Sequence, residues 1–100
     1  GIEEYGKGLI AYSLGNLVFG GNLELSTFDG LLLQVTLDFD RGGLRQTQAR
    51  LIPVLTSGAA PANDFRPVVA QGEDKERILD TVRADSARPF PETFILGQVP

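Results

Sequence analysis

The chain has 100 residues, of which 42% are hydrophobic and 22% are charged, a balance typical of folded globular proteins rather than disordered ones. Nine basic and thirteen acidic residues leave a net charge of −4, which argues against nucleic acid as a partner because no basic surface would track phosphates. Cysteine and histidine are both absent, so disulfides, thiolate or imidazole metal sites and serine–histidine pairs are excluded.

The first predicted element is a hairpin with arms at residues 2–5 and 9–12. Gly6 and Gly8 lie between the arms and supply a turn that depends on glycine. The second arm is the more apolar of the two. We therefore expect the chain to begin with two short antiparallel strands.

A turn at residues 13–16 comes next and leads into a short apolar segment at 17–19, which we predict to be a buried strand. Two glycines and an asparagine at 20–22 tolerate positive φ and close that strand. Residues 23–30 have no clear period and are predicted to form a loop or an irregular edge.

The clearest period in the sequence lies at residues 31–39, where apolar and polar side chains alternate. This pattern predicts a half-buried antiparallel strand, with a buried face made of Leu33, Val35, Leu37 and Phe39. Residues 40–43, Asp-Arg-Gly-Gly, supply the reversal, and residues 44–55 form the return arm. Because Pro53 cannot donate a ladder hydrogen bond, we expect this arm to leave the sheet or lie at its edge there.

Residues 56–72 are rich in turn formers and predict a connecting loop, with a short extended piece at 66–70. A helix is predicted from residue 73 to about 84, with acids in its first turn and a supportive pair between Glu73 and Arg77. Prolines after the helix end it. The apolar tail behind them is expected to dock back through Phe90, Phe94, Ile95 and Leu96.

The predicted fold class is therefore α+β, with antiparallel β hairpins that form part of a sheet and one C-terminal helix. The chain is either a single domain or a C-terminal fragment. It divides into β hairpins at 1–55, a connecting loop at 56–72, and a helix with its tail at 73–100.

Three motifs suggest chemistry and are set aside on their spacing. Residues 11–15 resemble a relaxed nucleophile elbow around Ser13, but the chain has no histidine to act as its base. Residues 15–22 space their glycines like a P-loop, yet they lack the lysine and the hydroxyl residue that hold phosphate and magnesium. Residues 38–43 begin like a calcium loop, although the glutamate required at its twelfth position is replaced by Ala49.

Residues 1–22 carry a resemblance to a known family in their turn and the strand after it, through Tyr12, Ser13, Leu14, Gly15, Asn16 and Phe19. The segment resembles the part of the bacterial capsule-synthesis (CapA, poly-gamma-glutamate synthesis) family that follows its last metal-binding His-x-His motif. Residues 50–54, Arg-Leu-Ile-Pro-Val, extend the likeness into the second hairpin. The family has a calcineurin-like metallophosphatase fold.

The resemblance implies that the chain is the C-terminal portion of a metallophosphatase-like fold and the inside of a larger protein. The family's Asp, Asn and His metal ligands lie upstream, so the segment is expected to complete the sheet beside the active site without catalysing or binding metal itself. Its main partner is then the remainder of the parent chain. The intact parent would be a metal-dependent hydrolase or phosphoesterase-like enzyme of capsule or poly-gamma-glutamate biosynthesis that holds a divalent metal.

The resemblance also implies a location and a site. The parent is expected in the bacterial cell envelope, extracytoplasmic and membrane-associated. No apolar run of this segment approaches the roughly 20 residues that span a bilayer, so the segment itself is not expected to insert. The family places Ser13, Gly15 and Asn16 in a turn on the substrate side. The Asn16 amide then either bonds a phosphate-like or carboxylate group, or serves only as a turn residue.

A second hypothesis belongs to the binding class. In it, the chain is an independently folded binding or oligomerisation module that pairs an edge strand with itself or with a partner. A homo-oligomer would follow. This hypothesis requires a strand edge that the rest of the chain leaves free.

Overall fold

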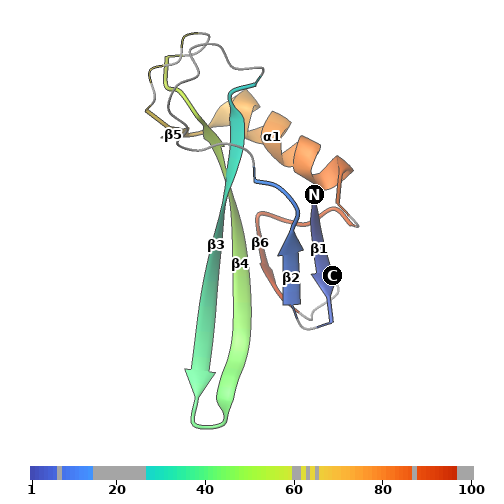
Figure 1. Ribbon diagram of the computed structural model, residues 1–100. Helices are drawn as coiled ribbons and strands as arrows, with labels where there is room; N and C mark the ends of the chain where they lie inside the picture. The colour runs from blue at the N-terminus through green and yellow to red at the C-terminus, as the bar shows by residue number, and fades with distance from the viewer. Residues whose placement is uncertain are drawn as a thin grey trace.

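A computed structural model describes residues 1–6, 8–14, 27–59, 62, 64, 66–86 and 88–96. Within these residues the chain forms antiparallel strands and one helix, which confirms the predicted α+β class (Figure 1). In chain order the elements are β1 (Ile2–Tyr5), β2 (Gly8–Ala11), β3 (Asp29–Asp40), β4 (Gly43–Leu55), β5 (Val68–Val69), α1 (Gly72–Ala84) and β6 (Thr93–Ile95).

The N-terminal hairpin is confirmed as a separate two-stranded sheet. β1 pairs with β2 from Ile2 opposite Ala11 to Tyr5 opposite Gly8. Gly6 takes a positive φ of 60° in the turn, a conformation that glycine adopts without a steric penalty. Ile2 is buried and joins the main core, so this small sheet is held against the rest of the molecule.

The second hairpin is longer than predicted, because β3 already begins at Asp29. β3 and β4 pair from Asp29 opposite Leu55 to Asp40 opposite Gly43, with one register shift between Asp38 and Phe39. Gly43 has a φ of 113°, which allows a tight reversal followed by a bulge. The predicted turn at 40–43 is therefore confirmed, and so is the antiparallel strand after it.

The predicted burial of β3 is wrong over its distal half. Val35, Leu37 and Phe39 are 47%, 51% and 63% exposed. The alternation is real, but the hairpin extends beyond α1 and the C-terminal tail, which cover only its proximal half (Figure 1). Alternation indicates which side chains share a face, and only neighbouring elements decide whether that face is covered.

β4 is the central strand of the larger sheet, with β3 on one side and both β5 and β6 on the other. The expectation that this arm leaves the sheet or lies at its edge at Pro53 is therefore wrong. The Pro53 carbonyl accepts a hydrogen bond from the Ala70 N–H at 2.9 Å, so Pro53 faces the side of β5. In an antiparallel strand the N–H and C=O of one residue point the same way, and the missing N–H thus removes no bond to β3.

Helix α1 and the tail cover one face of the sheet. Ile78 and Leu79 are the buried residues of the helix, and Glu73 and Asp74 lie in its first turn. Arg77 does not pair with Glu73 as expected, because its guanidinium bonds two other carboxylates.

The apolar tail docks back, and part of it adds a strand to the sheet. Phe94 of β6 lies opposite Ala49, and its ring centroid is 4.8 Å from that of Phe90. Both rings are buried. They complete a core of buried apolar residues made of Ile2, Leu31, Ala49, Leu51, Ala70, Ile78, Leu79, Phe90 and Phe94.

Several predictions fall wholly or partly outside the described residues, among them part of the turn at 13–16 and part of the loop at 56–72. The strand at 17–19 and its closing turn at 20–22 lie there entirely. Of the predicted loop at 23–30, the described part begins at Thr27, and Asp29 and Gly30 already belong to β3.

Candidate functional site

The turn after β2 carries Ser13, the described member of the predicted substrate-side group. Gly15 and Asn16 lie outside the described residues. Ser13 is exposed, and the carbonyl of the next residue, Leu14, accepts a hydrogen bond from the Leu31 N–H at 2.9 Å. This bond fixes the chain that leaves β2 against the start of β3.

Ser13 lines a hollow of about 230 Å³ between this turn, the start of β3 and helix α1. Its lining is part apolar and part polar: Gly1, Ser13, Leu14, Asp29, Gly30, Leu31, Ile78, Thr81, Val82 and Asp85. Pockets that enclose drug-sized ligands have volumes of roughly 300–1,000 Å³. The hollow is therefore suited to one small group or the end of a larger ligand, rather than to a whole nucleotide.

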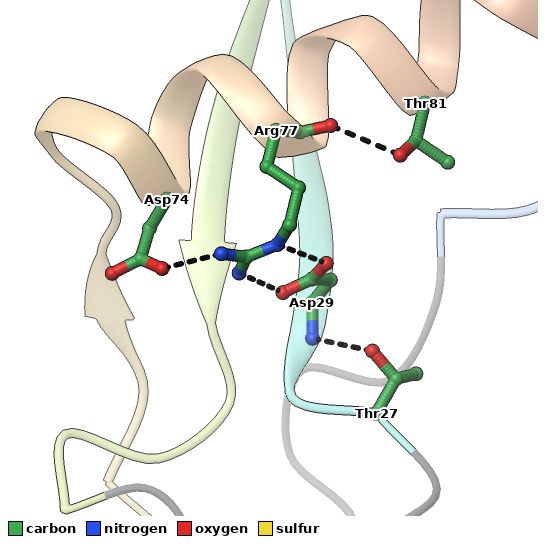
Figure 2. Close-up of polar contacts among 5 residues, drawn as sticks. All are labelled: Thr27, Asp29, Asp74, Arg77 and Thr81. Atoms are coloured by element: carbon green, nitrogen blue, oxygen red, sulfur yellow. Dashed lines mark hydrogen bonds and ion pairs between the residues drawn. The ribbon is translucent and has the colours of Figure 1, made fainter.

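Asp29, which lines the hollow, is held by an arginine clamp from α1 (Figure 2). Arg77 donates from Nε and Nη2 to the two oxygens of Asp29, at 3.1 and 2.6 Å, and from Nη1 to Asp74 at 2.6 Å. Hydrogen bonds to these two carboxylates raise the pKa of Arg77 above its ordinary value. A two-point contact of this kind has a defined geometry, and it ties α1 to the first residue of β3.

The clamp also decides what Asp29 can do. Both of its oxygens already accept from Arg77, and its own N–H donates to the Thr27 hydroxyl at 3.1 Å. Across the described ranges, no three acidic, histidine or cysteine side chains gather in a group that could hold a metal ion. The hollow thus offers hydrogen-bonding groups rather than metal ligands.

At another side of the hollow, the backbone at Gly1 lies very close to the backbone at Asp85. The Gly1 nitrogen donates to the Asp85 carboxylate at 3.1 Å, and the Ile2 N–H donates to the Ser86 hydroxyl at 3.0 Å. A Cβ atom on Gly1 would overlap the carbonyl oxygen of Asp85. The end of α1 and the N-terminal hairpin therefore lie so close that only glycine fits at this position.

Arg88 joins the same hairpin to the C-terminal tail. Its Nη2 donates to Glu4 at 2.7 Å, and its guanidinium carbon lies 4.1 Å from the centroid of the Phe90 ring. A guanidinium at this distance from an aromatic ring is attracted to the ring face. The Arg88 Nη1 atom is buried and has no hydrogen-bond partner in the described part of the chain.

The loop before β5 contains a buried hydroxyl that sequence reasoning missed. Ser57 is fully buried, and its Oγ accepts from the N–H groups of Ala59 and Asp64, each at 3.1 Å. It also lies 2.6 Å from the Ala62 carbonyl and 2.9 Å from the Asp64 carboxylate. The Arg66 N–H, followed by Ser57, lowers the pKa of Asp64. Ser57 thus organises the loop, and no histidine exists to activate it as a nucleophile.

A second hollow, of about 360 Å³, lies beside β4 between the points where β5 and β6 pair with it. Lys75 of α1 and Glu92 contribute to its lining and form an ion pair of 2.9 Å. This pair links the helix to the chain that enters β6. Its two charges compensate each other, so the hollow presents no excess charge of either sign from this pair.

Of the predicted site, the structure places Ser13 at a hollow and gives no placement for Gly15 and Asn16. The carboxylates at the hollow, Asp29 and Asp85, had no motif that could have revealed them, because their neighbours come from far along the chain. Comparisons with protein-family models, with curated proteins and with solved structures find no match to this chain.

Proposed function

We propose that this chain is the C-terminal structural segment of a capsule or poly-gamma-glutamate biosynthesis protein with a calcineurin-like metallophosphatase fold. In this proposal the segment completes the sheet beside the active site and is not catalytic alone. The observation that carries the proposal is the position of Ser13. It belongs to the matching turn, it lines the hollow, and its neighbour Leu14 is bonded to β3.

The chemistry of this segment would be that of a substrate-side wall. The Ser13 hydroxyl, with the Asn16 amide after it, can bond a phosphate-like or carboxylate group without a change of charge. The described residues do not fit a metal ion, because the Asp29 carboxylate is occupied by Arg77 and the chain has no histidine or cysteine. The preceding part of the parent chain would therefore have to supply the metal ligands.

The proposed location is the extracytoplasmic face of the bacterial envelope, where capsule polymers are assembled. Among the described residues, no helix has the length and apolar character needed to cross a bilayer.

A metal titration tests the proposal that the metal ligands lie in the parent chain outside this segment. Calorimetry with zinc and manganese on residues 1–100 should give no stoichiometric binding of submicromolar affinity. The chain has no histidine or cysteine to favour zinc, and no three carboxylates of the described residues gather to hold manganese. A longer protein that carries Asp, Gly-Asn-His and His-x-His motifs ahead of this segment should bind a divalent metal. Tight stoichiometric binding by residues 1–100 alone would contradict the proposal.

A further inference from the structure

Among the described residues, no strand pairs with β3 on the edge that faces away from β4. The hydrogen bonds of the sheet show which backbone groups of β3 point toward this edge. The carbonyl of Pro53 in β4 bonds to the Ala70 N–H on the β5 side. The backbone N–H and C=O of Leu31, which lies opposite Pro53, must therefore point away from β4. The bond from the Leu31 N–H to Leu14 confirms this direction. By the same alternation, the N–H and C=O groups of Leu33, Val35 and Leu37 also point outward.

No described residue bonds to the backbone of Leu33, Val35 or Leu37 on that side. In Figure 1 no other labelled element lies along this side of the distal half of β3. Soluble proteins usually protect such an edge with lysine, proline, a bulge or an inward-pointing charge. Residues 31–37, Leu-Leu-Leu-Gln-Val-Thr-Leu, contain none of these, and the bulge and the first acid come only at Asp38.

Exposed apolar side chains lie along the distal half of the same hairpin. Val35 and Leu37 share one face of the hairpin, and Phe39 and Leu44 lie opposite each other near its tip. The opposite face is polar in this region, with Gln34 and Thr36 on β3. Open backbone groups and uncovered apolar side chains therefore coincide on the distal half of β3.

We propose that a second copy of this chain pairs with β3 in antiparallel orientation, about a two-fold axis through Val35. The outward groups of Leu33, Val35 and Leu37 are symmetric about Val35, so this register pairs all three residues and allows up to six backbone hydrogen bonds. The neighbouring registers are poorer. One meets Leu31, whose N–H already bonds to Leu14, and the other reaches the register shift after Asp38.

Side chains favour the same register. Leu33 lies opposite Leu37 of the second copy, and the two copies of Val35 face each other, so apolar side chains meet on one face. On the other face Gln34 lies opposite Thr36, and no like charges are brought together. The register is therefore complementary in backbone, apolar contact and charge, which selects a second copy over an unrelated extended peptide.

The expected dimer is weak and depends on concentration. Pairing two strands of this length with their exposed apolar side chains gives a small interface, below the roughly 1,200 Å² of total buried area at which standard specific interfaces begin. Affinity at this size is set by the cost of association as much as by area. We expect dissociation constants in the micromolar range or weaker. The inference is independent of the proposed family, because it uses only the edge of β3.

Sedimentation velocity over a concentration series tests the pairing. The unmodified chain should shift from monomer to dimer as its concentration rises. Val35→Lys should weaken the dimer at least tenfold, because the two lysines would meet at the axis. Thr36→Lys is the matched control, since it adds the same charge one residue away on the polar face, and it should still dimerise. Far-ultraviolet circular dichroism verifies that both variants are folded.

Single cysteines test the register, because the chain has none of its own. Val35→Cys should form a disulfide-linked dimer on oxidation, since directly opposite Cα atoms lie about 5.5 Å apart. Leu37→Cys should not, because its two copies would be roughly 13 Å apart along the strand. An unmodified chain that stays monomeric up to millimolar concentration would overturn the proposal. Unchanged association of Val35→Lys, or equal cross-linking of the two cysteine variants, would also overturn it.

Discussion

Replacement of Leu51 by alanine should destabilise the fold strongly, because Leu51 is 1% exposed and lies in the central strand under α1 and the tail. The change removes three carbons from a buried site, worth about 2.4 kcal/mol at roughly 0.8 kcal/mol per methylene. The cavity that remains adds to this loss, as it does for other buried leucines. We expect the free energy of unfolding to fall by about 3 to 4 kcal/mol.

Leu37→Ala is the matched comparison. Leu37 lies on the same face of the same hairpin, but it is 51% exposed. Only about half of the transfer free energy is lost, and no cavity forms, so the expected loss is about 1 kcal/mol. The contrast between the two leucines measures how far along the hairpin the core extends.

Urea unfolding followed by circular dichroism measures both variants against the unmodified chain. Low protein concentration is required, so that pairing through the edge of β3 does not contribute to stability. Similar m-values would show that both variants unfold from the same compact state. Equal losses for Leu51→Ala and Leu37→Ala would refute the reasoning, because the distal half of the hairpin would then be as well covered as its proximal half.

Three further variants test the local contacts. Gly1→Ala should lower the melting temperature, because its Cβ would overlap the Asp85 carbonyl, whereas Gly8→Ala makes only an ordinary 3.5 Å contact and should not. Asp29→Asn should lower the free energy of unfolding in urea by about 0.5 to 1 kcal/mol, and by less at high salt, because its ion pair with Arg77 is partly exposed. Asp80→Asn should lower it by less, because it disrupts only a 3.7 Å pair with Arg83. Because the pKa of Asp64 is lowered in the folded state, its stabilisation is present above about pH 3.8 and is lost as the pH falls through the folded-state pKa. The melting temperature of Asp64→Asn should therefore depend less on pH in the acid range. The same pH dependence in this variant and in the unmodified chain would contradict this.

Local patterns predicted the elements well, because the signals that define them are short-range. Glycine at the turns, alternation in residues 31–39 and the apolar face of residues 78–82 each act within a few residues of the chain. The prediction at Pro53 was wrong because a proline weakens a sheet only where its missing N–H would have bonded to a neighbouring strand. The predicted burial of Leu37 was wrong because α1 and the tail do not extend far enough along the hairpin to cover this side chain.

The candidate site was harder to predict than the fold. Ser13 was found through the resemblance, but the rest of the hollow is assembled from residues far apart in sequence, such as Asp29 with Arg77 and Gly1 with Asp85. Spacing along the chain carries no information about such pairs. The Ser57 network has a short-range signal, an aspartate seven residues on in a turn-rich stretch, and that signal could have been used.

The most direct test of the proposed function compares Asn16→Ala with Asn16→Gly in a longer protein that carries this segment behind the metal-binding motifs. If the amide bonds a charged group of the substrate, both variants should lose roughly ten- to a hundred-fold in turnover or affinity, with metal content unchanged. If Asn16 only adopts a left-handed turn, glycine should replace it without loss. Full activity of the Asn16→Gly variant would contradict a substrate-side role for this turn.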